Sequence, residues 1–201
     1  MASPTRVLGL HGSEGNGDSF RQVLAQWSND WEIVTIDGPH EKGMGYAWWN
    51  MPPYVRSFNA TEYDGYEASR EAVLEAWTRP DLVVGHSQGA ILLTALLANE
   101  EIAQHPRLGY ILNGVAWPNP YTTQLEALQP ASSLQQITRV LILVGDQDAI
   151  NPPAQAQRVT AALRNAGYDV TVLSHPGGHG VPTREGPTKD AILEWIDRGI
   201  S

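Results

Sequence analysis

One serine lies in a pattern that could make it a nucleophile. Residues 81–90, which read DLVVGHSQGA, place Gly-x-Ser-x-Gly between an apolar run and a second apolar stretch. In a turn between a strand and a helix, small residues two positions before and after Ser87 let the elements approach closely and leave the hydroxyl exposed. The alternative is a glycine-rich turn in which Ser87 caps a helix. The order of strand and helix favours the nucleophile.

A serine hydroxyl also needs a base to take its proton and a carboxylate to orient that base. One later loop carries Asp146 and Asp148, and the next carries His175 and His179. We expect His179 to be the base, because the glycines on both sides leave room for its ring to turn, whereas His175 ends a strand. We expect Asp148, deeper in its loop, to be the acid, and Asp146 to brace the turn.

The oxyanion formed on attack requires backbone N–H donors aimed at it. We expect one donor from Gln88, directly after the nucleophile, and the other from Ser13 in the loop 10–17, which reads LHGSEGNG. This loop lacks a following lysine and Gly-x-Gly-x-x-Gly spacing, so phosphate binding is disfavoured. His11 is expected to brace the loop, and His86 to pack beneath the nucleophile.

Alternating apolar runs and helical stretches predict an α/β fold that positions these residues. The pattern indicates about six strands in a mainly parallel sheet with helices on both faces. Right-handed crossovers then place the loops that follow the strands along one edge, where ligands bind. The predicted strands are Arg6–Leu10, Trp31–Asp37, Asp81–Gly85, Leu108–Asn113, Val140–Gly145 and Val170–Ser174, and the predicted helices are Ser19–Trp27, Tyr63–Thr78, Ala90–Gln104, Ala154–Ala166 and Thr188–Arg198.

Length and composition narrow the class of protein. With 201 residues and 42% hydrophobic content, we expect a single domain, residues 1–201. The net charge of −9 disfavours nucleic acid as a partner. Cysteine is absent, so thiolate chemistry is excluded, and no apolar stretch approaches the roughly 20 residues of a membrane span. The N-terminus does not resemble a signal peptide, so a cytoplasmic protein is expected.

Two long connections, residues 38–62 and 114–138, are predicted to be loop or lid segments over the catalytic edge. They are rich in aromatic residues, which could form an apolar wall for an uncharged acyl or alcohol group. The alternative is that these aromatics cap the core without touching a ligand. Arg56 and Arg184 could approach the rim. The expected substrate-binding residues are Trp48, Trp49, Met51, Tyr54 and Trp117.

Taken together, the motifs resemble the FSH family of serine hydrolases, within the α/β-hydrolase superfamily and close to small carboxylesterases. The resemblance implies that Ser87, Asp148 and His179 form the triad and that no cofactor is needed. Many members carry Phe where His86 stands, and the antiparallel N-terminal hairpin of larger α/β-hydrolases is missing. The matching segments are 10–12 with Asn16, 37–40, 85–90, 145–148 and 175–182.

The expected function is a serine esterase that hydrolyses a small-molecule ester or thioester with an apolar acyl or alcohol group through an acyl-enzyme. A metal hydrolase is disfavoured because the histidines show no His-Glu-x-x-His pattern. Three alternatives stay open: an acyltransferase, a thioesterase that acts on a biosynthetic intermediate, and a non-catalytic ligand-binding protein with this fold.

Overall fold

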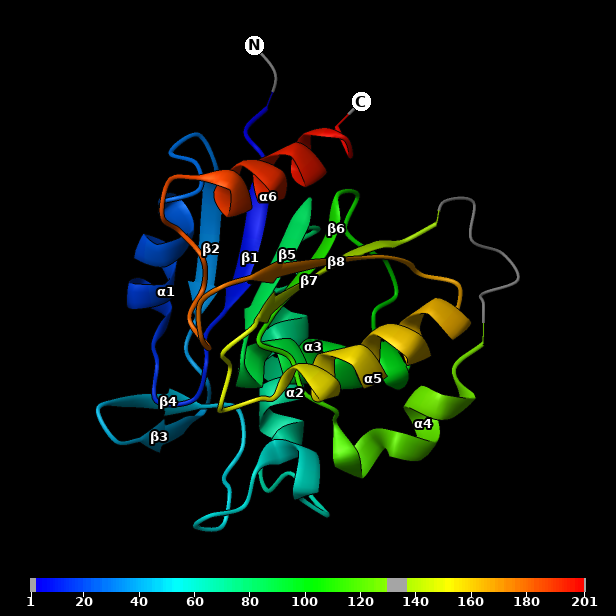
Figure 1. Ribbon diagram of the computed structural model, residues 1–201. Helices are drawn as coiled ribbons and strands as arrows, with labels where there is room; N and C mark the ends of the chain where they lie inside the picture. Colours follow the sequence, from blue (N-terminus) through cyan, green and yellow to red (C-terminus); the bar gives the residue numbers. More distant parts are fainter. Residues whose placement is uncertain (1–2, 130–136, 201) are drawn as a thin grey trace.

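A parallel six-stranded sheet forms the centre of the computed structural model, which describes residues 3–129 and 137–200 (Figure 1). The strand order is β2-β1-β5-β6-β7-β8, and each neighbouring pair is parallel. The predicted α/β class, with a mainly parallel sheet of about six strands, is confirmed. The strands are β1 (Arg6–Leu10), β2 (Glu32–Ile36), β5 (Leu82–His86), β6 (Gly109–Asn113), β7 (Arg139–Gly145) and β8 (Asp169–His175).

Helices cover both faces of this sheet because successive strand residues point to opposite sides. In β5, Val83 packs in one core, and Leu82 and Val84 pack in the other. The first core contains side chains of α2 (Tyr66–Ala76), α3 (Gln88–Ala98) and α5 (Pro153–Asn165), and the second those of α1 (Gly17–Ala25) and α6 (Pro187–Asp197). Across the described ranges, no helix is long and apolar enough to cross a membrane.

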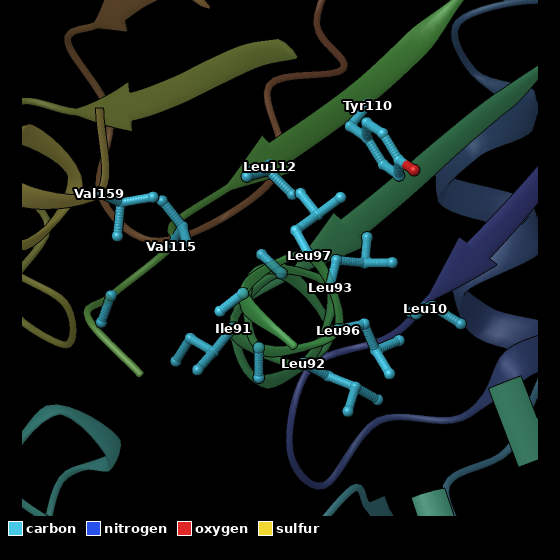
Figure 2. Close-up of a cluster of buried hydrophobic side chains, with 14 of the residues drawn as sticks. Leu10, Ile91, Leu92, Leu93, Leu96, Leu97, Tyr110, Leu112, Val115 and Val159 are labelled. Atoms are coloured by element: carbon cyan, nitrogen blue, oxygen red, sulfur yellow. The ribbon is translucent and has the colours of Figure 1, made fainter. Parts of the chain in front are cut away.

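Helix α3 is buried along its whole length and carries the turn that follows β5. All 11 of its residues are buried, and apolar side chains, among them Ile91, Leu92 and Leu96, project from it in different directions (Figure 2). The helix was predicted to continue to Gln104, but it ends at Ala98. Glu100 adopts a left-handed φ of 53°, and its N–H and that of Glu101 donate to carbonyls of the last turn. This hydrogen-bond pattern ends the helix at a residue other than the usual glycine, so the end of the helix could not be predicted from a glycine signal.

The connection 38–62 contains an antiparallel hairpin that the sequence did not predict. Its strands are β3 (His40–Lys42) and β4 (Gly45–Ala47), and a 3₁₀ turn at Ser57–Asn59 follows. The N–H of Glu14 donates to Tyr46 O over 2.8 Å, and the N–H of Tyr46 donates to Gly15 O over 2.7 Å. The hairpin therefore packs against the loop that follows β1.

The connection 114–138 folds partly into short helices. A 3₁₀ turn at Asn119–Tyr121 leads into α4 (Thr122–Ala127). Residues 130–136 of this predicted loop or lid lie outside the described residues.

Candidate active site

Ser87 occupies a strained turn between β5 and α3. Its backbone has φ 52° and ψ −117°, outside the usual regions for a residue with a side chain. Glycines on both sides make the turn possible. A Cβ at Gly85 would lie 2.7 Å from Ala90 Cα, and one at Gly89 would lie 2.3 Å from Leu10 O. The Gly-x-Ser-x-Gly spacing thus reflects close backbone contacts that position the hydroxyl.

The structure brings Ser87, His179 and Asp148 together in a hydrogen-bonded relay. Ser87 Oγ lies 2.7 Å from His179 Nε2, and His179 Nδ1 lies 2.7 Å from Asp148 Oδ2. The other carboxylate oxygen of Asp148 accepts the N–H groups of Ile150 and Asn151, each over 2.9 Å. A fixed carboxylate favours the tautomer in which Nδ1 of His179 donates, which leaves Nε2 free to accept the serine proton.

The alternative acid and base lie outside this relay. The Asp146 side chain is exposed, and its backbone N–H donates to His175 O over 2.8 Å. His175 is buried at the end of β8, and desolvation lowers its pKa. Both residues shape the neighbouring loops without reaching Ser87.

Gly114, directly after β6, makes room for the imidazole. It has a left-handed φ of 58°, and a Cβ there would lie 2.8 Å from His179 Cε1. Its carbonyl accepts the side-chain amide of Asn151 over 2.7 Å. The end of a third strand therefore sets the position of the histidine, which the sequence analysis did not anticipate.

Ser13 and Gln88, the expected oxyanion donors, line the same cavity of ≈ 330 Å³ as Ser87 and His179. The loop that carries Ser13 is held by His11, whose Nε2 accepts the Gly38 N–H over 3.0 Å and whose Nδ1 lies 2.7 Å from Gly12 O. Burial lowers the pKa of His11, in keeping with a neutral ring that braces the loop.

The side chain of Gln88 joins this edge to the connection 38–62. Its Oε1 accepts the Trp48 N–H over 2.8 Å, and its Nε2 donates to Trp49 O over 3.0 Å. The Trp48 indole N–H in turn donates to His11 O over 2.8 Å. The residue after Ser87 thereby fixes the long connection as well as beginning α3.

Comparisons with known proteins show the family to which the chain belongs. A family model described as Serine hydrolase (FSH1) matches residues 1–191. The chain belongs to this family of serine hydrolases. It is 29% identical to Esterase OVCA2 of Danio rerio, over 90% of this chain and 92% of that protein, and 27% identical to Esterase CG5412 of Drosophila melanogaster, over 98% and 76%. The resemblance seen in the motifs is confirmed.

Solved structures show the same fold at low sequence identity. Esterase PE8 has a TM-score of 0.75 and 20% identity, with 98% of this chain and 93% of that chain covered. The Bacillus cereus carboxylesterase has a TM-score of 0.66 and 19% identity, with 99% and 90% covered. These neighbours support the fold assignment of the FSH hydrolase.

In this FSH hydrolase, most of the aromatic residues expected at the substrate are part of the core. Trp48 and Trp49 are 0% exposed, and Trp117 is 1% exposed. The Trp49 ring stacks on Tyr63 at 4.1 Å. The expectation that these three tryptophans form a substrate wall is therefore corrected: their large apolar surfaces anchor the two long connections to the core. That placement is the alternative considered for them.

Of the other two residues expected at the substrate, Met51 and Tyr54, one lies at the Ser87 cavity. Met51 lines the Ser87 cavity, whereas Tyr54 is fully exposed and lies outside the cavity lining. Arg184, expected near the rim, lines a separate hollow formed by residues 175–178 and 180–188. The apolar side chains at the Ser87 cavity are Met51, Val55, Ile91 and Ile150.

Two cationic side chains line the Ser87 cavity of the FSH hydrolase. Lys42 donates to Ser13 Oγ over 3.1 Å and lies 3.9 Å from Glu14 Oε1. Arg56 lines the cavity between the hairpin and the 3₁₀ turn. Lys42 was not predicted at this cavity because the hairpin that carries it was not predicted.

A second histidine lies beside the relay. The ring centroid of His86 is 5.0 Å from that of His179. The side-chain amide of Asn113 donates to His86 Nδ1 over 2.9 Å and to His179 O over 3.2 Å. Burial, and secondly the neighbouring His179, lower the pKa of His86 to about 4. A neutral His86 therefore supports the histidine loop without adding a competing charge.

Replacing Gly114 with Ala is expected to displace His179 and lower kcat about 100-fold, because a shift of about 1 Å at a reacting group costs that much. Gly180→Ala is the matched control, since a Cβ at Gly180 meets nothing within 4 Å. Ester hydrolysis and thermal unfolding of both variants are the measurements. Equal kcat values for the two variants would contradict the role of Gly114.

Replacing His86 with Phe is expected to reduce the amount by which the free energy of unfolding falls as the pH is lowered. Below pH 6.5 the unfolded chain binds a proton at this histidine, whereas the folded chain binds it only near pH 4. The free energy of unfolding therefore falls over that window by up to about 3 kcal/mol through His86. Urea unfolding of the wild type and the variant at pH 7 and pH 4.5 measures how steeply the free energy of unfolding depends on pH. A variant with the wild-type pH slope would disprove the assignment, whatever its offset at pH 7.

Proposed function

We propose that the protein hydrolyses carboxylic esters or thioesters with Ser87 as nucleophile, His179 as general base and Asp148 as the orienting carboxylate. The observation that carries this proposal is the pair of 2.7 Å contacts that join the three side chains. A serine hydroxyl within hydrogen-bond reach of an oriented imidazole has the geometry that nucleophilic catalysis requires.

In the proposed mechanism, Ser87 Oγ attacks the carbonyl carbon while its proton passes to His179 Nε2. The N–H groups of Ser13 and Gln88 stabilise the resulting oxyanion. His179 then donates the proton to the leaving alcohol or thiol, and an acyl-enzyme forms on Ser87. A water that loses its proton to His179 attacks this ester and restores the serine.

Hydrolysis is favoured over acyl transfer because water can reach the base. The His179 side chain is 19% exposed, whereas that of Asp148 is 2% exposed. A non-catalytic binding protein would not need the aligned relay. The proposed substrate is a small molecule whose acyl or alcohol chain contacts the apolar lining at Met51, Val55, Ile91 and Ile150.

Replacing Ser87 with Ala is expected to abolish turnover of a 4-nitrophenyl ester and labelling by a fluorophosphonate, because both require the nucleophile. Product analysis of the wild type with added alcohol acceptors distinguishes hydrolysis from transfer. A variant that retains near-normal turnover would show that another residue is the nucleophile.

Replacing Asp148 with Asn is expected to lower kcat about 10⁴-fold, the loss seen when the corresponding carboxylate of a serine protease is replaced. The amide would favour the wrong tautomer of His179. Asp146→Asn is the matched control, because that side chain is exposed and outside the relay, and it should change kcat by less than about threefold. The reverse order of effects would assign the acid to Asp146.

A further inference from the structure

More cations than carboxylates line the Ser87 cavity, although the protein as a whole has a negative net charge. The whole chain carries 13 Lys and Arg against 22 Asp and Glu. Nevertheless, two of those cations, Lys42 and Arg56, lie in the lining of one cavity of ≈ 330 Å³, together with a single carboxylate, Glu14. An anionic ligand, which the overall charge would repel, meets a locally positive surface here.

The two cations differ in whether their side chains already have partners within the protein. Lys42 is bonded to Ser13 Oγ at 3.1 Å and lies 3.9 Å from Glu14. Arg56 forms no ion pair or side-chain hydrogen bond with any residue in ranges 3–129 and 137–200. Its guanidinium is therefore available to a ligand in the cavity.

We propose that the preferred substrate carries a carboxylate at the end of the chain that occupies this cavity, and that Arg56 binds this carboxylate. The inference rests on the proposed function, since it concerns the substrate of the same serine. It differs from the expectation, made from the sequence, of an uncharged acyl or alcohol group.

The chemistry of the lining supports a carboxylate on a short carbon chain. A guanidinium presents parallel N–H donors that match the two oxygens of a carboxylate. Met51 and Val55 line the same cavity as Arg56 and Ser87 and offer apolar contact to the methylene groups of such a chain. Lys42 adds a second positive charge on the oxyanion side of the cavity. Arg56 is therefore a specificity residue, and it takes no part in the chemical step.

Two matched pairs of esters test the proposal and locate the carboxylate. For the acyl side, kcat/KM is compared for 4-nitrophenyl hydrogen adipate and 4-nitrophenyl hexanoate, with the uncatalysed rate subtracted. For the alcohol side, acetate release is compared for 4-acetoxybutanoate and butyl acetate. We expect the anionic member of one pair to be preferred about tenfold, and this preference to fall as NaCl screens the charges.

Replacing Arg56 with Gln is expected to lower the ratio of kcat/KM values, anionic over neutral, about tenfold, and Arg56→Lys should restore part of it. Arg21→Gln, at an exposed position on α1, is the control and should leave the ratio unchanged. A preference for the neutral ester in both pairs, or a ratio that Arg56→Gln does not change, would overturn the proposal. Failure to hydrolyse any of the four esters, with no fluorophosphonate labelling, would instead refute the proposed function.

Discussion

The strained turn at Ser87 is the constraint on which the site depends. A left-handed backbone at a serine costs on the order of 1–3 kcal/mol and persists only where surrounding packing enforces it. Here α3 enforces it, since all 11 residues of the helix are buried between the sheet and the helices of one face. The turn places the hydroxyl at the edge of the sheet where the loops after β7 and β8 bring Asp148 and His179.

The chemistry of the site could be predicted from the sequence because it follows from local rules. The glycine spacing around Ser87 requires a tight turn, and parallel strands bring successive loops to one edge. The choice of Asp148 and His179 over their neighbours rested on position within each loop, and the structure brings these two residues to Ser87.

The lining of the cavity could not be predicted because it depends on how the connection 38–62 folds. Its two strands have only three residues each, too short for a periodic pattern. Without the hairpin, Lys42 had no predicted place. The tryptophans were assigned to a ligand wall because their loops lie near the catalytic edge, but a large apolar ring gains more from full burial than from a half-solvated wall. Gly114 and Asn113 carried no sequence signal beyond their place at a strand end.

The dual use of Gln88 limits how this enzyme can be re-engineered. Its backbone follows Ser87 directly, while its side-chain amide is hydrogen-bonded to the main chain of Trp48 and Trp49 in the neighbouring connection. Exchanging residues 38–62 for a loop of another length, in order to admit a different ligand, would leave that buried amide unsatisfied and loosen the start of α3. Loop grafts on this scaffold therefore need to preserve the main-chain path at 48–49, or to replace position 88 together with the loop.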